Sequence, residues 1–360
     1  MTRTMSSRDR VLTAIAHNEP DRVPIDYVAN PEIDQRLAQH FRLAPGDHDA
    51  LLQALDVDFR HRWPNYAGPK LHRDLPDRLV DEWGRRCRWI AHETGGYWDW
   101  CDWPLENAGL EEIDAWPMPA PDDHDYKAFA AACRRYADEH YCVVAGGAGV
   151  GDIINFTGML RTMQQVLIDL ATDDPAGLRL IDRKLDVGVE VAHRALDAAH
   201  GYVDLLFIGE DLGTQIGPLM SLDMFRKHIR PRLQRYVDLA KAHNLPVMIH
   251  SCGSSSWAFD DFVDMGIAIV DTLQPEAKDM APAYLKQRYG DRLAFHGMIS
   301  TAGPVAYGSV DDVVAVVRET LEIMMPAGGY CLAPTHCLQS NSPVENVVAM
   351  YDAARQFGQY

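Results

Sequence analysis

The chain has 360 residues, and its 34 Lys and Arg against 52 Asp and Glu give a net charge of −18. So acidic a protein lacks the clustered cations that nucleic acid or an anionic membrane surface requires, so neither partner is expected. Apolar residues make up 47% of the chain, but no apolar run approaches the ~20 residues of a membrane span. A chain of this length can bury roughly 75% of its unfolded surface without help from disulfides or metals.

The N-terminal segment MTRTMSSRDR has no apolar core of the kind found in secretory signals, and the seven cysteines are an odd number. Both features favour a cytoplasmic protein with free thiols, of which a few could serve metal binding or catalysis.

Along the chain, short apolar runs alternate with long helical patterns. The runs are continuously apolar, which is typical of strands buried on both faces of a parallel sheet. The predicted strands are residues 23–26, 57–60, 142–145, 203–208, 247–250, 267–272, 293–296 and 330–333.

The helices between these strands carry clear start signals. Asp174 precedes a proline and predicts a capped helix, and Ser309 with Asp312 predicts a capping box that opens a helix over 310–324. Ser342 with Glu345 predicts a second capping box before the last helix.

Eight strands, each followed by a helix, predict a single-domain (β/α)8 TIM barrel over residues 1–360. A doubly wound sheet is the alternative, but it would need a glycine-rich fingerprint after the first strand, where Tyr-Val-Ala-Asn stands at 27–30. The glycine-rich stretch 146–151 follows a later strand and is interpreted as a tight loop rather than a phosphate cradle.

One stretch, about 63–136, departs from the alternation and is rich in Trp, Pro and Asp, as in Asp-Glu-Trp-Gly at 81–84. We predict a long insertion that packs over the barrel mouth and shapes an apolar pocket. The alternative is that its tryptophans cover a satellite core.

In such a barrel the active site lies at the carboxyl ends of the strands. Polar and metal-competent residues follow five of the predicted strands. They are Glu210 with Asp211, His250 with Cys252, Gln274, His296, and His336 with Cys337.

The sharpest of these features is His250-x-Cys252, because both residues leave the end of one strand and an imidazole with a thiolate suits zinc. His336 is the candidate third ligand, Cys337 stands next to it, and Glu210 could be a further ligand. The alternative is a structural cysteine beside a hydrogen-bonded histidine.

Other residues are open to two interpretations. His296 either lines the mouth or is a structural histidine, while Asp152 and Asn155 either cap the following helix or reach the pocket. We take Glu210 and His296 as catalytic candidates, and Asn155, Asp211 and Gln274 as substrate-binding candidates.

Several motifs together resemble the uroporphyrinogen decarboxylase-like superfamily, and within it the cobalamin-dependent methyltransferases. They are Arg-Asp-Arg-Val at 8–11, Asp-Arg-Val-Pro at 21–24, Asp-Glu-Trp-Gly at 81–84, Gly-Glu-Asp-Leu-Gly at 209–213, His-Ser-Cys-Gly at 250–253, Phe-His-Gly at 295–297 and the segment 328–346. The resemblance covers nearly the whole chain and implies a (β/α)8 barrel.

In the coenzyme M methyltransferases of methanogens, zinc is held by the His and Cys of His-x-Cys-Gly and by a Cys after the last strand. Carried over, these ligands become His250 and Cys252, while the third falls on His336 instead of a cysteine. A histidine after the last strand is more similar to the pattern of substrate-side methyltransferases, including O-demethylases of aromatic methyl ethers. Those enzymes pass a methyl group from the substrate to the cobalt of a separate corrinoid protein.

The resemblance therefore implies a zinc cofactor, a corrinoid (cobalamin) protein as partner and a small-molecule methyl donor or acceptor, with Glu210 or His296 positioning the substrate or delivering a proton. A metal-free decarboxylase is one alternative, but it uses an arginine-rich segment near the first strand, and 24–30 has no arginine. A non-catalytic ligand-binding barrel is the other. The oligomeric state, including a homodimer, is left open.

Overall fold

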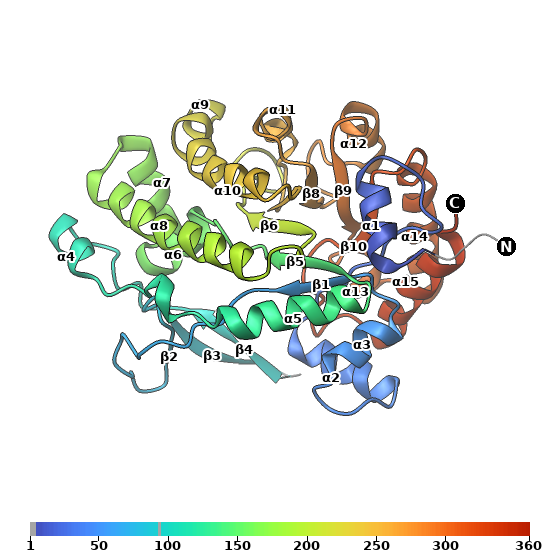
Figure 1. Cartoon of the computed structure of the whole chain (residues 1–360), viewed down its shortest axis with the longest axis horizontal. Helices are drawn as coiled ribbons and strands as arrows, with labels where there is room; N and C mark the ends of the chain where they lie inside the picture. The colour runs from blue at the N-terminus through green and yellow to red at the C-terminus, as the bar shows by residue number, and fades with distance from the viewer. Residues whose placement is uncertain (1–4, 93–94) are drawn as a thin grey trace.

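The computed structural model describes residues 5–92 and 95–360. Seven parallel strands form one curled sheet in the order β1-β5-β6-β7-β8-β9-β10 (Figure 1). They are β1 (Phe59–Arg62), β5 (Cys142–Gly146), β6 (Leu205–Gly209), β7 (Val247–Ser251), β8 (Ile269–Thr272), β9 (Ala294–Ile299) and β10 (Tyr330–Pro334). Seven of the eight predicted strands are thus present, and no end is shifted by more than three residues.

The eighth predicted strand, residues 23–26, is wrong as a strand, because the segment makes only an isolated parallel bridge between Ile25 and Leu332 of β10. Pro24 has no N–H to donate, and the N–H of Ile25 donates to the side chain of Asp58 instead of to a strand backbone. The carbonyl of Ile25 accepts from the N–H of Asp58, just before β1. The segment therefore lies between the two edge strands and bonds to the chain at both.

Helices surround the sheet and enclose the main apolar core against it (Figure 1). The α-helices are α1 (Ser7–Ile15), α2 (Pro31–His40), α3 (His48–Ala54), α4 (Leu110–Ala115), α5 (Tyr126–Asp138), α6 (Ile154–Arg161), α7 (Met163–Thr172), α8 (Pro175–Ala198), α9 (Leu222–Met224), α10 (Arg230–Ala242), α11 (Phe259–Met265), α12 (Pro282–Tyr289), α13 (Pro304–Tyr307), α14 (Val310–Met324) and α15 (Val344–Phe357). Three short helical turns are η1 (Pro121–Asp123), η2 (Phe225–Ile229) and η3 (Ser256–Ala258). Within the described residues, every helix is too short or too polar to cross a bilayer.

The capping signals are confirmed at two helices and wrong at the third. Asp174 accepts from the first backbone N–H groups of α8, and Ser309 forms the predicted capping box of α14. The last helix instead has Pro343 at its N-cap and no side-chain cap. The hydroxyl of Ser342 is buried without a hydrogen-bond partner among the described residues.

The segment between β1 and β5 contains a second, antiparallel sheet, β2 (Leu79–Val80), β3 (Arg86–His92) and β4 (Gly95–Trp100), which lies apart from the parallel strands in Figure 1. Helix α5 falls inside the stretch predicted as an insertion, yet it packs on β1, β5 and α8. Trp116 joins a small satellite core with Leu105, Ile113 and Leu180.

The glycine-rich stretch 146–151 is a turn after β5. Gly146 has φ +108°, and a Cβ atom there would lie 2.1 Å from the carbonyl oxygen of Phe207. Only glycine fits this close approach, which holds the loop against β6 at the carboxyl end of the sheet.

Candidate metal centre and active site

Three predicted site residues meet where β6 and β7 end. Asp211 follows β6, His250 is the penultimate residue of β7, and Cys252 comes directly after the end of β7. The Cys252 Sγ lies 3.3 Å from His250 Nε2, and His250 Nε2 lies 3.7 Å from Asp211 Oδ1. One ligand atom from each residue lies within 4.8 Å of the other two. We call these three residues the Asp-His-Cys cluster.

Hydrogen bonds from neighbouring residues hold the cluster in this arrangement. Asp211 Oδ1 accepts from the backbone N–H of Cys252 at 2.7 Å, and Asn155 Nδ2 donates to Asp211 Oδ2 at 2.9 Å. Gln274 Oε1 accepts from the N–H of Gly253 at 2.8 Å. Asn155 and Gln274, both predicted to bind substrate, therefore contact the cluster or its loop directly.

The donor set of the cluster fits zinc. Tetrahedral zinc with nitrogen or oxygen ligands at about 2.0–2.1 Å and sulfur at about 2.3 Å separates its ligand atoms by roughly 3.3–3.6 Å. The two separations above are close to that range. His250 Nδ1–H also donates to Asp271 Oδ2 at 2.6 Å, which is the carboxylate support that metal-binding histidines commonly have. Three protein ligands would leave one position open.

Asp271 belongs to an alternating chain of histidines and aspartates across the mouth, which we call the His-Asp chain: His61, Asp26, His296, Asp271 and His250. His61 Nε2 lies 2.7 Å from Asp26 Oδ2, and His296 Nε2 lies 3.1 Å from the same oxygen. On its other side, His296 Nδ1 lies 2.6 Å from Asp271 Oδ1. The chain thus connects the 23–26 segment, through β9 and β8, to the cluster.

Charge in the His-Asp chain is stabilised by mutual contact. Burial alone would lower the pKa of His296, but its hydrogen bonds to Asp26 and Asp271 outweigh this and raise the pKa to about 10. Burial would raise the pKa of Asp271, yet hydrogen bonds from His250 and His296 lower it to about 2. Both nitrogens of His296 therefore carry protons and donate to carboxylates at neutral pH.

Two cavities adjoin the cluster. The mouth cavity, of about 380 Å³, is lined by the His-Asp chain together with Phe59, Phe207, His336 and Cys337. The outer cavity, of about 520 Å³, is lined by Asp211, by Asn155 and by Trp100 and Trp103 from the segment between β1 and β5. His250 lines both cavities, so a molecule in either could reach the cluster.

Two of the predicted site residues, His336 and Glu210, lie outside the Asp-His-Cys cluster. His336 is exposed and lines the mouth cavity, but the cluster of described residues takes its third member from Asp211. Glu210 is fully buried, and its carboxylate oxygens accept from the N–H groups of Ile153 and Ile154 at the start of α6. Burial, with Asp152 nearby, raises the pKa of Glu210 well above its usual value. Glu210 lines neither of these cavities, so the geometry assigns it to the loop and not to the reacting centre.

Residues 105–357, well over half of the chain, match the family model described as uroporphyrinogen decarboxylase (URO-D). The chain belongs to the uroporphyrinogen decarboxylase family. No curated protein sequence matches it.

Among solved structures, a methyltransferase from Methanosarcina mazei is similar to this URO-D family member with a TM-score of 0.66 and 19% sequence identity, over 98% of this chain and 99% of its own. At that identity the likeness shows the fold. A 3-keto-D-glucoside 4-epimerase from E. coli (TM-score 0.35, 16% identity, 65% and 86% coverage) and the IOLI protein with a bound zinc atom (0.36, 11%, 71% and 93%) are too distant to support an argument.

The sequence reasoning missed three residues of this URO-D site: Asp26, His61 and Asp271. A signal for two of them existed, because Asp26 and Asp271 are carboxylates inside otherwise apolar runs that were predicted as buried strands. A buried carboxylate requires hydrogen-bond donors, so its position near the end of a predicted barrel strand already indicated partners at the mouth.

Proposed function

We propose that this protein is a zinc-dependent methyltransferase that moves a methyl group between a small substrate, an aromatic methyl ether, and the cobalt of a separate corrinoid protein. The Asp-His-Cys cluster at the mouth, open to two cavities, is the observation that carries the proposal. The family membership and the fold shared with a methyltransferase support it.

In this proposal Asp211, His250 and Cys252 hold the metal. Zinc bound there would supply a Lewis acid for the ether oxygen and so stabilise the phenolate that leaves. Asp271 orients the imidazole of His250 and keeps its Nδ1 protonated, which leaves Nε2 free as the ligand atom. His296, with both nitrogens donating to carboxylates, acts as a positioning residue for Asp271 rather than as the proton donor we expected from the sequence.

The walls of the two cavities favour an apolar substrate. Trp100 and Trp103 line the outer cavity and Phe59 and Phe207 line the mouth cavity, so aromatic faces surround the cluster on both sides. Such walls bury an arene and exclude water from the reacting ether.

The metal-free decarboxylase is the less favoured alternative. A substrate with eight carboxylates would meet Asp26, Asp211 and Asp271 at the mouth. The arginines nearest the first predicted strand, Arg10 and Arg22, are instead paired with buried or neighbouring aspartates. Repulsion of that substrate is therefore expected.

Metal content of the protein purified without added metal tests the proposal, with Cys252→Ala as the test variant. His336→Ala and Cys337→Ala are controls, because both residues line the mouth cavity outside the cluster. We expect about one zinc per chain in the wild type and in both controls, and its loss in Cys252→Ala with an unchanged far-UV circular dichroism spectrum.

A corrinoid-coupled demethylation assay with a methoxyarene should then lose activity only in Cys252→Ala. Zinc-free wild-type protein that is folded, or full methyl transfer by Cys252→Ala, would overturn the proposal and favour a ligand-binding barrel or a metal-free enzyme.

A further inference from the structure

We propose that a second divalent metal ion, a transition metal such as zinc, binds between the carboxyl ends of α8 and α10, at the end of the barrel opposite the mouth. Its ligands are His193 and Asp197 of α8 and His243, which is the C-cap residue of α10. We call these three residues the helix-end group. The inference does not depend on the proposed methyl transfer.

The helix-end group lies before the strands, whereas the Asp-His-Cys cluster lies where the strands end. Asp197 is in the last turn of α8, which leads into β6, and His243 ends α10, which leads into β7. The residues of the Asp-His-Cys cluster lie at the carboxyl ends of these same two strands. An ion in the helix-end group would therefore join the two helix–strand units that carry the cluster.

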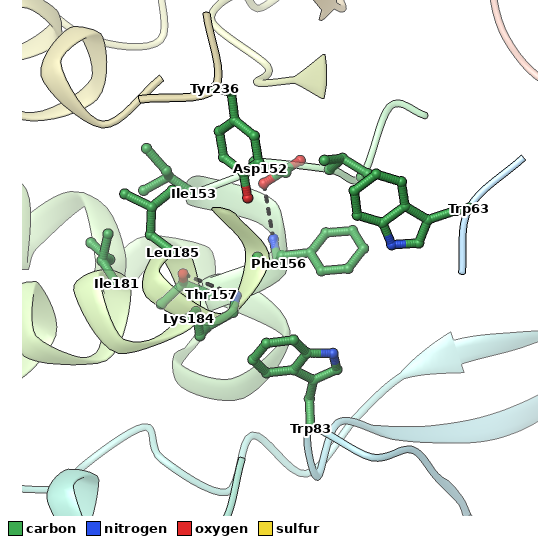
Figure 2. Close-up of a pocket in the computed structure, with 14 residues that line it drawn as sticks. Trp63, Trp83, Asp152, Ile153, Phe156, Thr157, Ile181, Lys184, Leu185 and Tyr236 are labelled. Carbon is green, nitrogen blue, oxygen red and sulfur yellow. Dashed lines mark hydrogen bonds between the residues drawn. The ribbon is translucent and has the colours of Figure 1, made fainter. Parts of the chain in front are cut away.

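Helices α8 and α10 pack on each other, so the three ligand side chains start from a fixed framework. A Cβ atom at Gly188 of α8 would lie 2.3 Å from the Tyr236 hydroxyl of α10. Tyr236 also lines a small chamber together with Leu185 of α8, as Figure 2 shows. Only glycine allows this close approach, which holds the two helices in register below the site.

Asp197 differs from the carboxylates that precede it along this interface. Those carboxylates pair with arginines of α10, at 2.7 and 2.8 Å: Asp182 with Arg232 and Asp186 with Arg235. Among the residues that the structure describes, the basic side chains within 4.0 Å of the Asp197 carboxylate are His193 and His243. An arginine can only donate, whereas an imidazole nitrogen can also coordinate a metal.

The distances within the helix-end group suit ligands of a shared ion better than hydrogen bonds. His193 Nε2 lies 3.6 Å from Asp197 Oδ2, and His243 Nε2 lies 3.6 Å from Asp197 Oδ1. A separation of 3.6 Å is too long for a hydrogen bond, but it is close to the roughly 3.3–3.6 Å between ligand atoms around zinc. One ligand atom from each residue lies within 4.8 Å of the other two.

The electrostatic surroundings favour a cation. The chain carries a net charge of −18, and the carboxyl ends of two helices add partial negative charge at this point. Arg194, next to His193, is paired with Glu190 and Asp122. Two imidazoles and one carboxylate suit zinc, nickel or copper, whereas magnesium and calcium prefer oxygen ligands alone.

The exposure of the ligands indicates weaker binding than at the Asp-His-Cys cluster. The side chains of His193 and Asp197 are 49% and 59% exposed, so binding must order both and displace their water. We therefore expect the ion to be lost during purification and to bind again when zinc is added, as a second zinc beyond the one expected at the cluster.

Equilibrium dialysis against zinc, with metal content read by mass spectrometry, tests the site. We expect His193→Gln, Asp197→Asn and His243→Asn each to bind one zinc per chain fewer than wild type. Asp186→Asn is the matched control, because Asp186 also links α8 to α10 but pairs with an arginine. His140→Asn, at an exposed histidine outside the group, is the second control. Both controls should bind as much zinc as wild type.

Histidine modification by diethyl pyrocarbonate places the ion. Added zinc should slow the modification of His193 at least tenfold in wild type, and magnesium should leave it unchanged. Asp197→Asn should lose this protection. Equal protection by magnesium, or unchanged modification of His193 in zinc, would overturn the assignment.

Two further outcomes would also overturn it: equal zinc content in wild type and the three ligand variants, or loss of the second zinc in Asp186→Asn, which would trace the effect to helix packing. Failure of the proposed function is distinguishable from these results. Cys252→Ala leaves the helix-end group intact, so zinc should still protect His193 in that variant, whether or not the protein transfers methyl groups.

Discussion

Asp58→Asn should destabilise the protein strongly, because Asp58 anchors the irregular segment that bonds to both edges of the sheet. Its carboxylate is fully buried and accepts from Arg10 Nη1 at 2.7 Å, Arg22 Nη1 at 2.8 Å and the N–H of Ile25 at 2.9 Å. Removing one partner of a buried ion pair costs about 3–5 kcal/mol. Arg10 keeps Asp21 as a partner, so we expect the lower end, about 3 kcal/mol.

The unfolding entropy converts this loss into a temperature. At about 2.1 cal/mol/K per residue, a chain of 360 residues has an unfolding entropy near 0.8 kcal/mol/K. A loss of about 3 kcal/mol therefore lowers Tm by about 4 °C. Differential scanning calorimetry measures the shift, and urea unfolding measures the free energy.

Asp56→Asn is the matched control, because Asp56 also pairs with Arg22, at 2.8 Å, but its side chain is 52% exposed. Exposed pairs contribute about 0–1 kcal/mol, so Tm should fall by about 1 °C or less. Equal losses in the two variants, or a loss below about 1 kcal/mol in Asp58→Asn, would refute the reasoning that burial makes this pair important.

Three further predictions concern the mouth. The pKa of His296 is raised from 6.5 to about 10, so the protonated imidazole stabilises the fold fully below about pH 6.5 and this contribution is lost as pH rises toward 10. Urea unfolding across that range should show a steeper decline of the free energy of unfolding in wild type than in His296→Gln. Gly146→Ala, whose Cβ would meet the Phe207 carbonyl, should cost about 3 kcal/mol, against about 1 kcal/mol for Gly201→Ala, which has φ +81° but open space around it. If the proposed zinc is bound, Asp271→Asn should weaken its binding about 10- to 100-fold in a chelator competition, and unchanged affinity would speak against support of the proposed site by Asp271.

The sequence was informative wherever local chemistry decides the structure. Continuous apolar runs identified seven strands, and the caps at Asp174 and Ser309 are local contacts within one helix turn. The resemblance to the uroporphyrinogen decarboxylase-like superfamily is confirmed by the match over 105–357. The prediction of a capping box at Ser342 was wrong because the same residues are also compatible with a helix that starts one residue later, at Val344, with Pro343 at its N-cap.

Contacts between distant residues were harder to predict. His250 and Cys252 were identified together because they lie two positions apart at the end of one strand, whereas the third member of the cluster had to be chosen from the residues that follow several strands. His336 and Asp211 both follow strands, and only the three-dimensional arrangement brings the Asp211 carboxylate to the Nε2 of His250. Glu210, one position earlier, points the other way and caps α6. Neighbours along a strand end face opposite sides, and a shift of one residue changes the role.

Residues 23–26, which do not form the predicted strand, connect the fold to the candidate site. Their irregular backbone allows the N–H of Ile25 to donate to Asp58 and places Asp26 in the His-Asp chain, next to His296. From Asp26 the chain passes through His296 and Asp271 to the ring of His250. A regular eighth strand would have used its backbone groups in a ladder to β1. The arginine-bound Asp58 holds the segment in place instead, so the same buried ion pairs that stabilise the fold also determine the position of Asp26 at the mouth.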